Sequence, residues 1–194
     1  MLFTRAAMMM TVVMITITRV SGDAYVQEAC NVTRYQDLCV QTLAPFSKTA
    51  RSSPSRWTRA GVYVAIESTK NVASFLVGLK RHGNMTGRGA GALADCVEVA
   101  QDALYNLYRS LGILRDLSPI DFDLQMSNLL TWLSAALTDE TTCVDEFDGI
   151  RGRQVNTVHS KVMNVSYITS NALALANWLA TSGIESVVNG PYKG

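Results

Sequence analysis

The chain of 194 residues has little proline, little histidine, few aromatic residues and almost no net charge. Four prolines and an aromatic content of 8% argue against an all-β sandwich, which needs many turns and aromatic strand residues. Two histidines are too few for a three-histidine zinc site. A net charge of +1 gives no electrostatic reason to expect nucleic acid. Because 48% of the residues are hydrophobic and 17% charged, we expect one compact, helical domain.

The N-terminal segment differs in composition from the rest of the chain. Five of the eight methionines lie within the first 14 residues. Arg5 precedes an apolar run of about a dozen residues, and small residues follow at Gly22 and Ala24. The run is shorter than the ~20 residues that a transmembrane helix requires. Residues 1–24 are therefore predicted to be a secretory signal peptide, and residues 25–194 the secreted domain.

All four cysteines lie in the predicted secreted part, at Cys30, Cys39, Cys96 and Cys143. An even number in a secreted chain predicts two disulfides, for which three pairings are possible. A metal site is disfavoured, because the sequence contains no Cys-x-x-Cys pair and no histidine close to two cysteines. No metal or other cofactor is predicted.

Three Asn-x-Ser/Thr sequons occur, at Asn31, Asn84 and Asn164. Such sequons are acceptors for N-glycosylation in secreted proteins. These three asparagines are therefore candidate glycosylation sites, in agreement with secretion.

Beyond Pro54, apolar residues recur at helical spacing in four segments. The segments run from Trp57 to Lys80, from Ala90 to Leu114, from Phe122 to Phe147 and from Val155 to Leu179. Ser118 and Pro119 are predicted as the N-cap and first residue of the third helix, and Gly83 as the C′ glycine of the first. Short connections between long helices predict an all-α, up-down-up-down four-helix bundle over residues 55–183.

The cysteine spacing supports this arrangement. Cys96 lies 23 residues before Pro119, and Cys143 lies 24 residues after it. In an antiparallel pair of helices that turns at Pro119, the two cysteines face each other and can form a disulfide. Cys30 and Cys39 then pair by exclusion and hold together a short helical hairpin, predicted over residues 25–53.

The sequence contains no recognisable catalytic motif. HExxH, GxSxG and P-loop patterns are absent, and the two predicted disulfides leave no free thiol. His82 lies in a cluster at a predicted helix end, where helix capping explains it, and His159 lies on a face expected to be solvated. We therefore predict that the protein is not an enzyme and acts by binding a partner.

Four segments resemble the plant pectin methylesterase inhibitor and invertase inhibitor family. They are CNVTRYQDLC at 30–39, ALADCVEVAQDAL at 92–104, TWLSAALTDETTCVDEF at 131–147 and SNALALANWL at 170–179. The resemblance implies a helical hairpin followed by a four-helix bundle, with the first cysteine bonded to the second and the third to the fourth. It also implies a cell-wall protein without catalytic activity.

The resemblance further implies one-to-one inhibition, in which the bundle covers the substrate cleft of an enzyme. The segments WLSAALTDETTC and SNALALAN favour pectin methylesterase as the partner. Acid invertase is the alternative, but none of the four prolines begins the Pro-Lys-Phe turn that invertase inhibitors tend to carry. A lipid carrier and a structural cell-wall glycoprotein are rival classes, although dense Leu, Val and Ala stripes leave a carrier little room. We expect secretion to the apoplast, with no nucleic acid or membrane as partner.

Five polar residues are predicted to form the partner interface. Glu98 and Asp102 lie one helical turn apart within a D-C-x-E-x-x-x-D-A motif, and Thr142 adjoins a predicted disulfide. Asp121 and Asp123 lie near the predicted turn between the second and third long helices. Pectin methylesterases, as the resemblance implies, use a pair of aspartates at their active site. We therefore expect association to strengthen as the pH falls, because carboxylates that face an acidic cleft bind protons in the complex.

Overall fold

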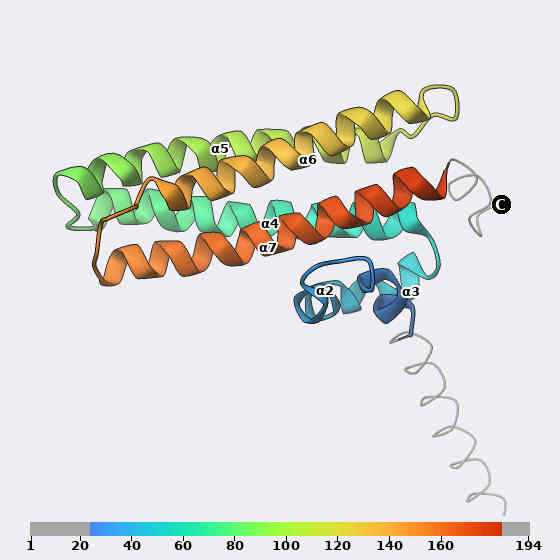
Figure 1. Ribbon diagram of the computed structural model, residues 1–194, viewed down its shortest axis with the longest axis horizontal. Helices are drawn as coiled ribbons and strands as arrows, with labels where there is room; N and C mark the ends of the chain where they lie inside the picture. The colour runs from blue at the N-terminus through green and yellow to red at the C-terminus, as the bar shows by residue number, and fades with distance from the viewer. Residues whose placement is uncertain (1–23, 184–194) are drawn as a thin grey trace, which may run out of the picture.

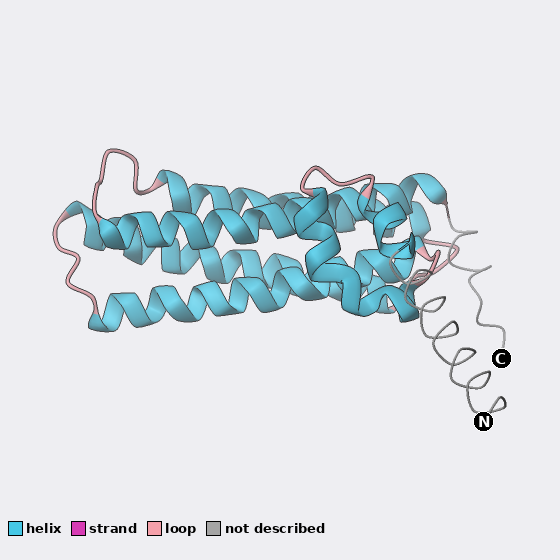
Figure 2. Ribbon diagram, turned by 90° about the horizontal axis from the view of Figure 1, so that it is seen from below, coloured by secondary structure: helices cyan, strands magenta, loops and turns pink. Residues whose placement is uncertain are grey.

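The computed structural model describes residues 24–183 of the chain. The predicted signal peptide lies outside the described residues except for Ala24, as do the last 11 residues. Every regular element within the described range is helical (Figures 1 and 2). None of the described helices is both long enough and apolar enough to cross a membrane.

Four long helices lie side by side and form the bundle (Figure 1). They are α4 (Pro54–His82), α5 (Arg88–Arg115), α6 (Phe122–Asp145) and α7 (Arg153–Ser182). Each helix packs against two neighbours, in the order α4, α5, α6, α7 and back to α4. The α4–α5 and α6–α7 connections lie at one end of the bundle and the α5–α6 connection at the other. The predicted up-down-up-down topology is confirmed.

A short hairpin precedes the bundle and packs against α4 and α7 (Figure 1). It comprises a helical segment at residues 24–30, α2 (Gln36–Leu43), the 3-10 turn η1 (Ala44–Phe46) and α3 (Ser47–Ala50). The Cys30–Cys39 disulfide joins its first segment to α2, with a Cα–Cα distance of 5.7 Å. The Cys96–Cys143 disulfide joins α5 to α6, with a Cα–Cα distance of 4.3 Å. Both predicted pairings are confirmed.

The start of α4 and its end differ in detail from the prediction. The helix begins at Pro54, three residues before the predicted Trp57, because Ser53 caps it by accepting a hydrogen bond from the Arg56 amide at 3.4 Å. At the other end Gly83 has a φ of −78° and an extended backbone. Gly83 thus follows the last helical residue as predicted, but it does not form the left-handed cap that is usual for a C′ glycine. Glycine is needed there for a different reason, because an added Cβ would collide with the Leu79 carbonyl oxygen.

The predicted start of the third long helix is also wrong. Helix α6 begins at Phe122, and Ser118 and Pro119 lie in the connection that precedes it. The Ser118 hydroxyl accepts a hydrogen bond from the amide of Ile120 at 3.3 Å, which makes a local turn instead of a helix cap. The Gln125 side chain accepts a second hydrogen bond, from the Ser118 amide at 2.8 Å. These two bonds satisfy backbone amides of the connection in a non-helical conformation.

The bundle core follows the predicted stripes closely. Most predicted core residues of the four long helices are buried, and those of α5 are buried without exception. The buried stripe of α5 comprises Leu93, Cys96, Ala100, Ala103, Leu107, Leu111 and Leu114. The main departure is Glu140, a carboxylic acid that lies on the buried stripe of α6 with an exposed fraction of 3%.

Candidate partner-binding surface

Four exposed side chains form one row along α5. Glu98, Asp102, Tyr105 and Arg109 are exposed and lie at positions i, i+4, i+7 and i+11. This spacing places them on a single face of an α-helix, about one turn apart. The row therefore extends the two predicted interface residues, Glu98 and Asp102, by an aromatic ring and a guanidinium group.

A second row on α6 runs beside the first. Trp132, Asp139 and Thr142 are all partly buried and share one face of α6. The Cζ of Arg109 lies 4.0 Å from the ring centroid of Trp132 and 5.5 Å from that of Tyr105. These cation–π contacts hold the Arg109 guanidinium between the two rings. Tyr, Trp and Arg are the residue types that contribute most to protein interfaces.

The middle of the surface is acidic. The Asn106 amide donates a hydrogen bond to Asp139 Oδ2 at 3.1 Å. Burial raises the pKa of Asp139, the Asn106 hydrogen bond opposes that rise, and the negative charge of Asp102 adds to it. The two carboxyl groups are thus near enough to interact. A partner that brings a cation or a shared proton to this pair would relieve their repulsion.

The structure does not bring all five predicted interface residues together. Thr142 lies beside the Cys96–Cys143 disulfide, at the level of Glu98 that the antiparallel register predicts. Asp121 and Asp123 are exposed near the α5–α6 connection. That connection lies about 20 Å further along α5 than Asp102, at 1.5 Å per residue.

Two exposed apolar side chains lie at this end of the bundle, Ile120 in the α5–α6 connection and Leu124 in the first turn of α6. Ile120 has an exposed fraction of 93% and Leu124 of 64%, and they flank Asp121 and Asp123 along the chain. Large apolar side chains exposed together indicate a contact surface when they lie beside polar groups. The candidate surface therefore comprises the outer face of α5 and α6 and this connection, and its two acidic parts lie at different levels.

Sequence reasoning missed Tyr105, Asn106, Arg109, Trp132 and Asp139. The spacing i, i+4, i+7 and i+11 from Glu98 was a signal for Tyr105 and Arg109. The α6 members could have been found from the register that the Cys96–Cys143 pairing sets, since each level of α5 faces one level of α6. The aromatic and cationic members became visible only when this register was combined with the exposure of each side chain.

Glu140 forms a separate polar layer inside the bundle. Its Oε1 atom accepts hydrogen bonds from the hydroxyls of Thr169 at 2.8 Å and Thr69 at 3.3 Å. Its Oε2 atom has no hydrogen-bond partner among the described residues. Burial raises the pKa of Glu140 to about 8, against the lowering effect of the two threonine hydroxyls. The adjoining cavity of about 10 Å³ is too small for a ligand, so the layer is a feature of the core.

The remaining candidate residues lie on the surface. Asn31, Asn84 and Asn164 are exposed, and so are His82 and His159. Within residues 24–183 no group of three histidine, cysteine or carboxylate side chains could hold a metal ion.

The chain is similar to proteins of one plant family. Residues 24–175 match the model of the family described as plant invertase/pectin methylesterase inhibitor. The chain is 48% identical over 163 residues to pectinesterase inhibitor 6 of Arabidopsis thaliana, covering 82% of this chain and 77% of that protein. It is 33% identical over 171 residues to a 21 kDa protein of Daucus carota, covering 86% of this chain and 89% of that protein.

A solved structure supports the fold. The crystal structure of a mutant pectin methylesterase inhibitor from Arabidopsis superposes with a TM-score of 0.64 at 19% sequence identity. The superposition covers 77% of this chain and 93% of that one. At this identity the likeness bears on the fold alone.

A hairpin-and-bundle fold with two disulfides and a mixed acidic and aromatic outer face defines a helical binding protein. The chain belongs to the plant invertase/pectin methylesterase inhibitor family, because the family model matches most of its length and a close relative is 48% identical. The resemblance noted in the sequence is thereby confirmed. The family is described as one of inhibitors, a close relative is named as an inhibitor, and the chain is not an enzyme.

Proposed function

We propose that the protein inhibits pectin methylesterase in the plant cell wall by forming a one-to-one complex that covers the substrate cleft of the enzyme. The observation that carries the proposal is the 48% identity to pectinesterase inhibitor 6 over most of both chains. Secretion to the apoplast, by way of the predicted signal peptide, belongs to the same proposal. Inhibition of acid invertase is the alternative, since the family name covers both activities.

The contact surface in this proposal is the outer face of α5 and α6. Tyr105, Arg109 and Trp132 supply rigid aromatic and cationic groups, which suit the centre of an interface. Glu98 and Asp102 stand beside them and give the surface a negative charge that selects its partner. The exposed Ile120 and Leu124 extend the contact to the end of the bundle.

The first experiment tests the target enzyme. The purified protein is titrated against a pectin methylesterase and, separately, against an acid invertase. We expect inhibition of the esterase that is complete near equimolar protein, and co-elution of the two in size-exclusion chromatography. Inhibition of invertase alone would overturn the proposal in favour of the alternative. Lack of inhibition of both enzymes would overturn it altogether.

The second experiment tests the surface. The triple variant Glu98→Ala, Asp102→Ala, Thr142→Ala is expected to lose affinity for the esterase by about tenfold or more, because truncated interface residues that matter cost at least 1–2 kcal/mol. A control triple variant of the same composition, Glu28→Ala, Asp37→Ala, Thr157→Ala, changes exposed residues of the hairpin and α7.

The control variant is expected to inhibit like the parent protein. Unfolding curves of all three proteins show whether each one is folded. If the first triple variant is folded and inhibits without loss, this surface is wrong although the target enzyme can still be right.

A further inference from the structure

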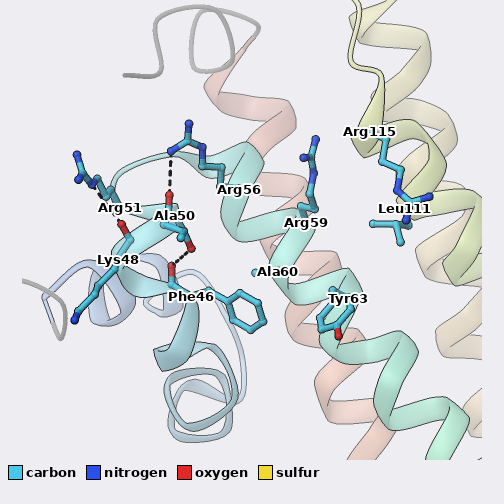
Figure 3. Close-up of a pocket in the computed structure, with 11 residues that line it drawn as sticks. Phe46, Lys48, Ala50, Arg51, Arg56, Arg59, Ala60, Tyr63, Leu111 and Arg115 are labelled. Carbon is cyan, nitrogen blue, oxygen red and sulfur yellow. Dashed lines mark hydrogen bonds between the residues drawn. The ribbon is translucent and has the colours of Figure 1, made fainter. Parts of the chain in front are cut away.

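A groove lies between the N-terminal hairpin, α4 and the end of α5, away from the α5–α6 face. It has a volume of about 740 Å³ and is bordered by α3, the first turns of α4 and the last turns of α5 (Figure 3). Pockets that bind small molecules commonly have volumes of ~300–1,000 Å³. The groove is thus large enough for an extended ligand.

The lining of this groove is strongly basic. Five of the 17 lysine and arginine residues of the chain border it: Lys48, Arg51, Arg56, Arg59 and Arg115. No aspartate or glutamate lies among its described lining residues. In a chain with a net charge of +1, this is a marked separation of charge. The groove therefore attracts anions, and a concave wall concentrates that field.

Hydrogen bonds hold three of the arginines in place. Arg56 Nη1 donates to the carbonyl of Thr49 at 2.9 Å, and Arg51 Nε donates to that of Lys48 at 3.4 Å. Arg59 donates to the carbonyl of Leu114, which ties α4 to the end of α5. Figure 3 shows Arg56 and Arg59 extending from α4 in the same direction. Fixed guanidinium groups bind carboxylates with less loss of entropy than mobile ones.

The backbone conformation of Arg51 supports a binding role for the connection between α3 and α4. Arg51 has a φ of +49° and is the only described residue other than glycine with a positive φ. Its carbonyl accepts a hydrogen bond from the indole nitrogen of Trp57 at 2.6 Å, which fixes the turn. With a ψ of −125° the residue lies outside the left-handed helical region, in a conformation that glycine adopts more readily than arginine. Such residues collect at binding sites.

Two aromatic rings complete the groove. Phe46 and Tyr63 lie 6.2 Å apart between ring centroids and meet edge to face. Tyr63 is exposed, and both rings border the space below the arginines (Figure 3). Sugar rings pack their C–H faces on aromatic side chains, whereas a simple inorganic anion makes no use of them. Cations along a groove with an aromatic wall therefore fit an acidic sugar chain.

We propose that this groove binds linear oligogalacturonate, the polymer of acidic sugars that removal of methyl esters from pectin exposes. The choice of this acidic sugar rests on the proposed function, since the product of the inhibited enzyme carries these carboxylates. Binding would retain the inhibitor on de-esterified pectin while the α5–α6 face remains available to the enzyme. Arg56 and Arg59 lie about 4.5 Å apart along α4, at 1.5 Å per residue, and could bind successive carboxylates.

The test is calorimetric titration of the purified protein with an oligogalacturonate of about ten sugars, in low salt where surface charges are least screened. The same oligomer with all carboxylates methyl-esterified and inorganic phosphate are titrated in parallel. We expect binding of the free acid, at least about tenfold weaker binding of the ester, and no comparable binding of phosphate, because only the free acid offers several charge-assisted hydrogen bonds.

Two double variants locate the site. Lys48→Gln with Arg115→Gln removes two charges from the groove, and neither side chain makes a hydrogen bond given above. Lys80→Gln with Arg81→Gln removes two exposed charges from the far end of α4. We expect the groove variant to weaken oligogalacturonate binding at least about tenfold and the control about twofold at most, since the loss of even one charge-assisted contact costs ~1.5 kcal/mol. Equal weakening by both variants would overturn the proposed site.

A further variant tests the sugar. Tyr63→Ala is expected to weaken binding of oligogalacturonate and to leave binding of poly-glutamate unchanged. If poly-glutamate binds as tightly as oligogalacturonate and Tyr63→Ala affects neither, the groove is a site for acidic polypeptides and the proposal is overturned. Esterase inhibition is measured for every variant. A parent protein that inhibits the esterase but does not bind oligogalacturonate contradicts the proposed groove ligand alone. A parent protein that binds oligogalacturonate but does not inhibit contradicts only the proposed function.

Discussion

The N-terminal hairpin and the four-helix bundle are stabilised in different ways. Helix α2 has eight residues, whereas α6 and α7 have 24 and 30. Isolated helices shorter than ~12–15 residues are marginal in water, so α2 cannot persist without outside contacts. The bundle helices pack on one another along their length. The hairpin instead buries its apolar residues against Trp57, Ala60 and Leu175 of the bundle.

The contacts that attach the hairpin are specific. The Asn171 side chain on α7 accepts a hydrogen bond from the Tyr35 amide at 3.1 Å and donates one to the Tyr35 carbonyl at 2.9 Å. The Tyr35 ring also stacks on Tyr167, with 4.1 Å between ring centroids. One amide side chain thus bonds both backbone groups of Tyr35, whose carbonyl also accepts a backbone hydrogen bond from the Cys39 amide at 2.9 Å. The bundle helices are thus stabilised by packing on one another, whereas the hairpin is stabilised by its contacts with the bundle surface.

The largest expected effect comes from the two disulfides. The Cys96–Cys143 bond spans 47 residues and the Cys30–Cys39 bond spans nine. In the chain-entropy model, the longer loop stabilises by about 4 kcal/mol and the shorter by about 2.6 kcal/mol. We therefore expect Cys96→Ala with Cys143→Ala to lower the free energy of unfolding in urea by more than Cys30→Ala with Cys39→Ala.

The structural consequences should run in the opposite order. Helices α5 and α6 stay packed without their disulfide, because their apolar stripes meet along the whole contact. The apolar contact of the hairpin with the bundle is confined to one small cluster, so its variant is expected to lose protection of the Tyr35 amide from hydrogen exchange. A hairpin variant that keeps this protection would show that the hairpin is more independent than the comparison holds.

The bundle was predictable from the sequence for a physical reason. Apolar residues such as Leu107, Leu133 and Val162 recur with the helical period because each turn must bury an apolar side chain. This period is visible within each of the four helical segments of the sequence. The connections follow no such period. Ser118 could cap a helix or make a turn, and the hydrogen bond from its amide to the Gln125 side chain favours the turn. The residues next to Ser118 do not reveal this interaction.

The same distinction holds for the candidate surfaces. Glu98 and Asp102 were predicted because a sequence motif contains them, but the motif carries no information about exposure. Arg109 became a candidate interface residue through its cation–π contact with Trp132 on the neighbouring helix. The basic groove could not be predicted at all, because Lys48, the α4 arginines and Arg115 come from three elements that only the tertiary fold brings together.

The second prediction concerns the polar layer, which lies in the bundle and not in the hairpin. Glu140 has its pKa raised to about 8 by burial, so the native state keeps a proton that the unfolded chain releases between its ordinary pKa and pH 8. The free energy of unfolding is therefore expected to be highest at acidic pH, to fall as the pH rises towards about 8 by at most about 1.4 kcal/mol per pH unit, and then to level.

Glu140→Gln is expected to flatten this dependence, because the amide stays neutral and can still accept from Thr169. Glu146→Gln, an exposed change beyond the end of α6, is the control and should retain the parent slope. The measurement is urea unfolding at a series of pH values from 5 to 9. A parent protein whose stability is flat over this range would show that Glu140 is already charged in the fold.

The third prediction tests the attachment of the hairpin. Asn171→Leu leaves the Tyr35 amide without its partner and removes one of the two hydrogen bonds to the Tyr35 carbonyl. We expect a loss of about 2 kcal/mol, since a buried unsatisfied group costs ~1–3 kcal/mol. Asn177→Leu, an exposed change on the same helix, is expected to stay within about 0.5 kcal/mol of the parent. Unfolding in urea gives both values. Equal losses in the two variants would mean that the Asn171 contacts do not hold the hairpin.

The smallest expected effects come from two glycines within the long helices. A Cβ added at Gly112 on α5 meets nothing within 4 Å, so Gly112→Ala is expected to stabilise the bundle by about 0.5–1 kcal/mol through the helix propensity of alanine. At Gly61 on α4 an added Cβ lies 3.1 Å from the Leu175 side chain and 3.3 Å from the Cα of Ala172. Because Leu175 also packs against the hairpin, α7 cannot retreat there without disturbing it, and Gly61→Ala is expected to destabilise. Thermal unfolding should therefore shift the two midpoints in opposite directions. A rise in both would mean that α4 and α7 can separate slightly at the hairpin without loss, and that the bundle surface adapts to the hairpin as much as the hairpin adapts to it.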